Sequence, residues 1–236
     1  MTVTKIGILV LAAISLCLPS IAWSQDGNVV IVTAQRSDYD YYDDEQSAIG
    51  LRRTADFFVQ PLYVSSDSRD RDQRRTEVYT MMREAIRLAR SNGIELVAGD
   101  YNLLPVTLEN VEDLSIGSGR RPDTSRIAIY AKVPISAATK SEDGAEAKIQ
   151  AYVSSVPKNG RSYIESGSIE LAIRNPDQYR NQVVQAIATE ARRYASYFGS
   201  DYGIEIKGLH AELSWTQISE QDVLLYIPHS FVIAPK

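Results

Sequence analysis

The sequence predicts an α+β protein in which two main helices pack on a largely antiparallel sheet. Apolar and polar residues alternate along residues 127–135, as expected for a strand with one buried and one solvent-exposed face. Two other stretches, residues 78–93 and 175–199, repeat their apolar residues at helical spacing. Turn-forming residues separate these segments, which favours strands and helices connected by short loops.

The first half of this fold is predicted to be strand, helix and strand. Residues 57–66 are rich in aromatic and β-branched side chains, and the charged residues 67–72 follow them as a turn. Asn92 and Gly93 end the helix in the manner of a left-handed cap, and residues 94–104 return to extended structure. The apolar residues that face the core from this helix are Val78, Met81, Met82, Ala85 and Ala89.

The middle of the chain is predicted to hold further strands and the second helix. Residues 149–153 and 169–173 also alternate, with a turn at residues 159–160 between them, which indicates a hairpin or meander. Asn175 is placed to cap the second helix, Pro176 suits its first position, and Gln178 completes a capping box. The apolar stripe of this helix continues to Phe198, and Gly199 ends it.

Two strands are predicted to end the chain. The apolar positions change phase at Gly208, which predicts a β-bulge between residues 204–206 and 209–215. Pro228 interrupts the apolar residues 223–233 and lacks a backbone donor. We therefore expect this last strand to lie at an edge or to carry a bulge.

The first 24 residues resemble a cleavable export signal. Lys5 precedes 13 residues without a charge, and small residues stand at positions 22 and 24. A membrane span needs about 20 apolar residues, so we expect cleavage after Ser24 rather than anchoring. The only cysteine, Cys17, leaves with the signal. The sequence thus predicts a periplasmic protein of a Gram-negative bacterium, with secretion as the alternative.

The remaining chain is divided into an N-terminal arm and one folded domain. Residues 25–50 are predicted to be an acidic, tyrosine-rich arm, read as a solvated loop, with a cation-binding loop as the alternative. Residues 51–236 are predicted to form one α+β domain, with a division into two subdomains near residues 115–125 as the alternative. Loss of Lys5 leaves 24 basic against 30 acidic residues, a formal charge of −6. This balance argues against a nucleic-acid partner.

No residue is predicted to be catalytic. The chain has two histidines and no spacing typical of a zinc site, and the phosphate-loop, dinucleotide and nucleophile-elbow motifs are missing. Residues 155–158 match a Ser-x-x-Lys pattern, but Pro157 opposes the helical turn that this motif needs. We therefore expect no metal and no cofactor, and we keep His229 as a candidate binding residue.

Arg120 and Arg121 are the other two candidate binding residues. They stand together in a glycine-flanked stretch, where two guanidinium groups can bind a phosphate or a carboxylate. The residues that follow, Pro122, Asp123 and Thr124, are typical of a turn. The turn is the preferred interpretation, and the anion site is the alternative.

Part of the chain resembles the SIMPL domain family of bacterial envelope proteins. The resemblance is carried by residues 188–199 (ATEARRYASYFG), by residues 203–206 (GIEI), and by the helix and strand of residues 77–96. It extends over residues 50–215. The predicted strands within residues 148–174 depart from the family, where a more helical connection is expected. The resemblance implies a periplasmic, non-enzymatic protein that self-associates, and it assigns no functional residue.

A shorter stretch resembles another group of envelope proteins. Residues 30–36 (VIVTAQR) are similar to the segment near the N-terminus of TonB-dependent receptors. Such receptors need a 22-stranded barrel and a plug, and 236 residues are too few for both. The hypothesis that remains from this resemblance is an accessory protein that engages the TonB system.

The functional expectation is an envelope interaction or scaffold protein. We expect a homo-oligomer or a complex with another envelope protein, and no transmembrane span. The alternatives are an envelope hydrolase with a carboxylate site that the sequence does not identify, and the TonB accessory. A deep pocket with convergent carboxylates favours the hydrolase, whereas a shallow surface with an exposed apolar patch favours assembly.

Overall fold

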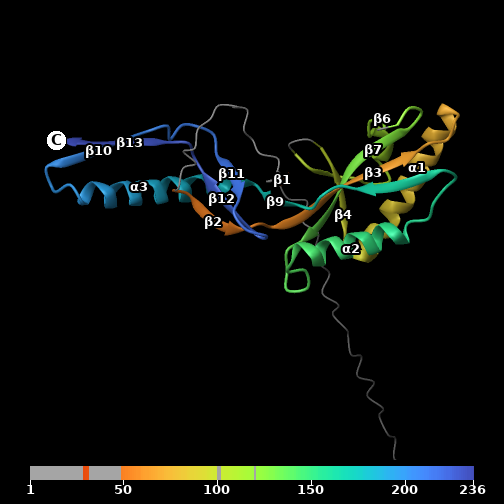
Figure 1. Ribbon diagram of the computed structural model, residues 1–236, viewed down its shortest axis with the longest axis horizontal. Helices are drawn as coiled ribbons and strands as arrows, with labels where there is room; N and C mark the ends of the chain where they lie inside the picture. The colour runs from red at the N-terminus through yellow and green to blue at the C-terminus, as the bar shows by residue number, and fades with distance from the viewer. Residues whose placement is uncertain (1–28, 32–48, 100–101, 120) are drawn as a thin grey trace, which may run out of the picture.

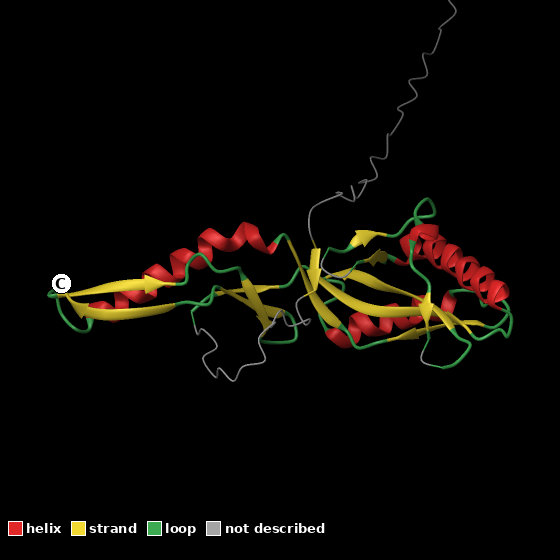
Figure 2. Ribbon diagram, turned by 90° about the horizontal axis from the view of Figure 1, so that it is seen from above, coloured by secondary structure: helices red, strands yellow, loops and turns green. Residues whose placement is uncertain are grey.

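The computed structural model of the chain describes residues 29–31, 49–99, 102–119 and 121–236. The molecule is elongated, with the longest strands at one end and a helix that extends toward the other end, where the chain terminates (Figures 1 and 2). The predicted export signal and most of the predicted arm at residues 25–50 lie outside the described residues. Sheets with antiparallel pairing and three α-helices confirm the α+β class, with one helix more than the two expected.

The largest sheet has eight strands, all paired antiparallel. Its centre is β3 (Phe57–Ser66) beside β7 (Ser125–Pro134), which pair along their full lengths. Both strands agree with their prediction. The others are β1 (Val29–Ile31), β4 (Glu95–Ala98), β5 (Leu104–Pro105), β6 (Gly117–Ser118), β8 (Ser162–Ser166) and β9 (Glu170–Arg174). Strand β6 and the start of β7, near the alternative subdomain boundary, therefore belong to one sheet.

Two helices, α1 (Arg71–Ala89) and α2 (Glu142–Ser155), cover one face of this sheet. The five predicted core residues of α1 are all buried against β3 and β7. A short 3-10 helix, η1 (Arg90–Asn92), follows α1, and Gly93 caps it in the left-handed conformation that was predicted. The helices also contact each other, because the buried Tyr152 hydroxyl donates to the carbonyl oxygen of Ala85 at 2.8 Å.

Helix α2 corrects the predicted strand at residues 149–153. Alternation along these five residues fits a strand, but the buried residues Ala145, Ile149, Tyr152 and Val156 recur at helical spacing over a longer window. Ser141 caps the helix by accepting from the amide of Gly144 at 3.1 Å.

A second core lies under α3 (Arg180–Ser196), which corresponds to the second predicted helix. Val183 and Ile187 of α3 are buried against β9 and a sheet of β2 (Leu51–Thr54), β11 (Ser214–Gln217) and β12 (Asp222–Tyr226). The predicted cap is wrong. Asn175 has a φ of 45° and makes no side-chain cap, and residues Pro176–Tyr179 form the 3-10 helix η3 before α3 begins.

The last four strands form one long interrupted hairpin. Strand β10 (Tyr202–Lys207) pairs with β13 (Ser230–Pro235), and β11 pairs with β12. Between them, residues 208–213 on one side face residues 227–229 on the other. The structure thus has a turn at Gly208, with a φ of 92°, where a one-residue bulge was predicted, and Pro228 separates β12 from β13.

Two short segments complete the fold. Residues Val111–Asp113 form the 3-10 helix η2 beside α1. Strand β1 is buried and pairs with β9, so Val30 and Ile31 of the TonB-like stretch are core residues. No helix among the described residues is long and apolar enough to cross a membrane.

Candidate functional site

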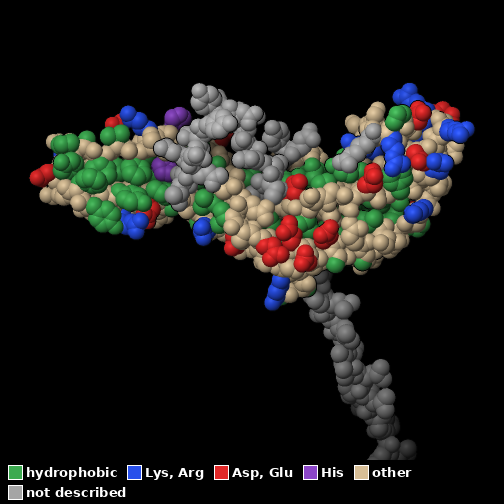
Figure 3. All heavy atoms as spheres, in the orientation of Figure 1, with side chains coloured by type: hydrophobic (Ala, Val, Ile, Leu, Met, Phe, Trp, Pro, Cys, Tyr) green, Lys and Arg blue, Asp and Glu red, His purple; other side chains and the backbone are tan. Residues whose placement is uncertain are grey.

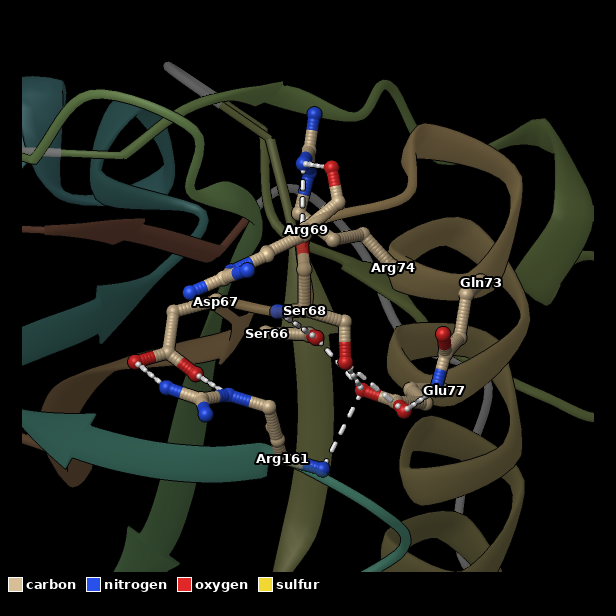
Figure 4. Close-up of polar contacts among 8 residues, drawn as sticks. All are labelled: Ser66, Asp67, Ser68, Arg69, Gln73, Arg74, Glu77 and Arg161. Carbon is tan, nitrogen blue, oxygen red and sulfur yellow. Dashed lines mark hydrogen bonds and ion pairs between the residues drawn. The ribbon is translucent and has the colours of Figure 1, made fainter.

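Figure 4 shows a buried carboxylate, Glu77, at the start of α1. It accepts hydrogen bonds from the hydroxyls of Ser66 at 2.6 Å and Ser68 at 2.8 Å, both at the end of β3 or just after it. The Gln73 side-chain amide donates at 2.9 Å, and the backbone amide of Arg161 donates at 3.2 Å from the loop before β8. One carboxylate therefore connects β3, α1 and the α2–β8 loop.

The hydrogen bonds determine how Glu77 titrates. Burial by itself raises the pKa of Glu77, but the four donors outweigh it and hold the pKa below the ordinary value of 4.5. Its oxygens are fully engaged, so Glu77 is not placed to act as a general base. Gly160 lies so close that a Cβ atom there would stand 2.2 Å from a Glu77 oxygen, which leaves no room for a ligand on this side.

Arg74 fixes the loop between β3 and α1 against β7. Its guanidinium donates to the carbonyl oxygens of Ser68 at 2.8 Å and Arg69 at 3.0 Å, and its Nε donates to the Ser125 hydroxyl at 3.2 Å. These bonds hold the start of α1 against the start of β7.

A bidentate ion pair closes the opposite side of this loop. Arg161 donates from Nε and Nη2 to the two carboxylate oxygens of Asp67, at 2.7 and 3.0 Å. The pair lowers the pKa of Asp67 and raises that of Arg161. Both oxygens of Asp67 are thus already engaged.

An arginine-lined cleft of about 720 Å³ lies between the first turns of α1 and the β6–β7 turn. We call it the arginine cleft. Figure 3 shows Lys and Arg side chains gathered at this end of the molecule. Its charged lining residues are Arg71, Asp72, Arg74, Arg75, Arg121 and Asp123. The guanidinium of Arg75 also lies over the Tyr79 ring, 5.0 Å from its centroid.

The arginine cleft contains one of the three candidate binding residues. Arg121 lines it, and Arg120 lies outside the described residues. The predicted turn is also present, since Asp123 has a φ of 58° and the amide of Gly119 donates to the Thr124 carbonyl oxygen. The two interpretations of this stretch are compatible, because the turn carries Arg121 to the edge of the cleft.

Three arginines of the cleft were not identified from the sequence. Arg74 and Arg75 follow Arg71 by three and four positions, so helix formation places all three on one side of the first turns of α1. The sequence feature that could have identified them is the high density of arginine at residues 69–75. This density indicates a cleft only when β7 is known to lie beside the start of α1.

His229, the third candidate, lies far from the arginine cleft, beside the β10–β13 ribbon. Its Nδ1 is 2.7 Å from the carbonyl oxygen of Ile227, and its ring stacks on Phe231 at 6.4 Å between centroids. His210 is exposed. Among the described residues, no group of three or more His, Cys, Asp and Glu side chains is arranged to hold a metal ion.

Carboxylates gather at the start of α2. Burial, followed by repulsion from Glu220, Asp143 and Glu146, raises the pKa of Glu142. Three of these four residues, Asp143, Glu146 and Glu220, are exposed. The group therefore lies on the surface and does not form the deep carboxylate pocket that the hydrolase alternative requires.

The end of the molecule opposite the arginine cleft carries exposed aromatic residues. We call residues 192–212 and 228–236 the distal arm; it comprises the last turn of α3 with β10 and β13 (Figure 1). Hydrophobic side chains cover much of the face seen in Figure 3. The aromatic cluster consists of Tyr194, Tyr197, Phe198, Tyr202 and Phe231. Tyr194 pairs with Tyr197 and Phe231, and Phe198 pairs with Tyr202, with ring centroids 5.7–6.5 Å apart.

The distal arm has no core of its own. No side chain in residues 192–212 or 228–236 is buried, whereas Val183, Ile187 and Ala191 on the same stripe of α3 are fully buried. Tyr197 is 71 % exposed and Phe198 57 % exposed. A groove of about 630 Å³ lies between α3 and β2 and reaches Tyr194. The surface of the distal arm is therefore continuous with this groove.

No protein-family model, curated protein or solved structure matches the chain. The function must therefore be argued from these two surfaces.

Proposed function

We propose that this chain is an exported, non-enzymatic interaction protein of the bacterial cell envelope that self-associates through its distal arm. The observation that carries the proposal is the arm itself, which presents an aromatic cluster and buries none of its own side chains. Large exposed apolar patches on soluble proteins mark contact surfaces, and aromatic residues are enriched in the cores of interfaces.

Two features favour a second copy of this chain as the partner that binds the distal arm. Strands β10 and β13 pair only with each other among the described residues, so each has an outer edge available for pairing with a strand of another copy. The arm also has four basic and three acidic side chains. This near-neutral surface repels a copy of itself only weakly.

The envelope location rests on the sequence of residues 1–24, which lie outside the described residues. The likeness to SIMPL domains supports the same assignment, and helix α2 removes part of the departure noted for residues 148–174. No specific observation favours the hydrolase or the TonB accessory. The carboxylates at the start of α2 are exposed, and the first residues of the TonB-like stretch are buried in β1.

Light scattering after size exclusion tests the proposal on the chain that begins at Gln25. We expect a mass of two or more chains for the wild type. Tyr197→Ser combined with Phe198→Ser should shift it to the mass of one chain, since two exposed aromatic anchors are lost while the buried stripe of α3 is kept.

The matched control replaces two exposed leucines outside the distal arm, one in β5 and one just after it. Leu104 and Leu108 are 67 % and 47 % exposed. Leu104→Ser with Leu108→Ser should leave the mass of the wild type unchanged. A wild-type chain that stays monomeric at all accessible concentrations contradicts the proposal, as does a loss of assembly in the control alone.

A further inference from the structure

The arginine cleft has an excess of positive charge that no residue in the described parts of the chain neutralises. Four guanidinium groups and two carboxylates line it, a net lining charge of +2. None of the four arginines takes part in an ion pair within the described parts of the chain. By contrast, Arg83 and Arg87 further along α1 pair with Glu112 and Glu84.

The carboxylates near the cleft either bind another residue or form no ion pair with the arginines of the cleft, among the described residues. Asp67 is close enough to Arg121 for that arginine to contribute to its lowered pKa, but both of its oxygens are bound by Arg161. Asp72 and Asp123 line the cleft without forming an ion pair with its arginines, as far as the structure describes them. The positive charge is thus available to a ligand.

The wall of the cleft also holds an unused hydrogen-bond donor. Thr124 is 6 % exposed, and its buried hydroxyl has no hydrogen-bond partner among the described residues. A buried hydroxyl without a partner is costly in a folded protein. The neighbouring Gly119 lies so close to Thr124 that a Cβ atom there would be 2.5 Å from its methyl carbon, so the loop packs tightly around this side chain.

We propose that the arginine cleft binds a phosphate dianion, as inorganic phosphate or as the phosphate monoester of a small molecule or lipid headgroup. A phosphate monoester carries a charge of about −1.5 to −2 and three acceptor oxygens, which match a net lining charge of +2 and several guanidinium donors. A volume of about 720 Å³ is large enough for a phosphorylated small molecule. The N-terminus of α1 adds little, because Asp70 already accepts from the amide of Gln73.

Calorimetric titration of the chain beginning at Gln25 tests this site, with inorganic phosphate, glycerol 3-phosphate and phosphatidate vesicles as separate probes at matched ionic strength. Arg71→Gln with Arg121→Gln should weaken binding at least about tenfold, because each lost guanidinium removes a charge-assisted hydrogen bond. Arg83→Gln with Arg87→Gln, on the same helix, should retain wild-type affinity. Binding of the soluble probes assigns a small-molecule ligand, and binding of vesicles alone assigns a lipid headgroup.

Thr124→Val separates a binding role from a structural one. The substitution keeps the shape of the side chain and removes only the hydroxyl. We expect weaker phosphate binding by about threefold or more, together with a melting temperature equal to or above that of the wild type, since no hydrogen bond within the protein is lost. The proposal is overturned if none of the probes binds, or if the Arg83 and Arg87 control loses as much affinity as the cleft variant.

Discussion

Glu77 is held by neutral donors from three parts of the chain and meets no basic side chain in its hydrogen-bond shell (Figure 4). An arrangement of this kind stabilises a buried charge mainly by hydrogen bonding. The hydrogen-bonded setting of Glu77 could not be predicted, because helical spacing places residue 77 only near the core. It does not reveal the two serines at the end of β3 and just after it, or the backbone amide from a distant loop. Only the fold brings these donors together.

Glu77→Gln should lower the free energy of unfolding by about 1.5–3 kcal/mol, because a buried carboxylate that accepts several hydrogen bonds becomes an amide with fewer acceptor sites. Chemical denaturation monitored by circular dichroism measures this change. Glu84→Gln on the same helix is the control. It removes one surface ion pair with Arg87 and should change stability by less than about 0.5 kcal/mol. Equal effects of the two substitutions would show that the hydrogen bonds of Glu77 are not stabilising.

The same carboxylate predicts a pH dependence. Because the pKa of Glu77 is lower in the folded than in the unfolded chain, its contribution is fully present above the ordinary value of 4.5 and is lost as the pH falls through the folded value. The difference in stability between wild type and Glu77→Gln should therefore be larger at about pH 6 than at about pH 3. A difference that grows on acidification contradicts the sign of this shift.

Secondary-structure elements divide into those that local sequence determines and those that it does not. Strand β7 and helices α1 and α3 were predicted because each has one strong period, and β3 was predicted because it is rich in aromatic and β-branched side chains. Helix α2 was missed because Ile149, Ala151 and Val153 also alternate, and only its contacts with α1 and the sheet select the helix. The turn between β10 and β11 was missed because a phase change does not distinguish a bulge from a longer interruption.

The cap of α2 provides a test at this scale. Ser141→Ala should lower the free energy of unfolding by about 1 kcal/mol, since the amide of Gly144 loses its side-chain acceptor. Ser154→Ala, at an exposed position of the same helix, is the control and should have an effect within about 0.5 kcal/mol of zero. Thermal or chemical unfolding of both variants decides the question. If residues 149–153 are a strand, as first predicted, the two substitutions should not differ.

At the scale of the whole molecule, the two candidate surfaces lie at opposite ends (Figures 1 and 3). Sequence reasoning found one arginine of the cleft, but it identified neither the aromatic cluster nor the separation of the two surfaces. Burial of an apolar residue depends on what packs against it. The apolar stripe of α3 therefore looks like one continuous core face in the sequence, although its C-terminal part is exposed in the structure. This separation allows the distal arm to assemble while the arginine cleft stays open.

Spin labelling of the arm tests self-association most directly. The chain that begins at Gln25 has no cysteine, so Val232→Cys and Leu104→Cys each introduce a single labelling site, at an exposed position of the distal arm outside the aromatic cluster and at an exposed position outside the arm. If copies meet through their arms, dipolar coupling between labels should be strong at position 232 and weak or undetectable at position 104. Coupling at position 104 with none at position 232, or no coupling at either position, would contradict assembly through the distal arm.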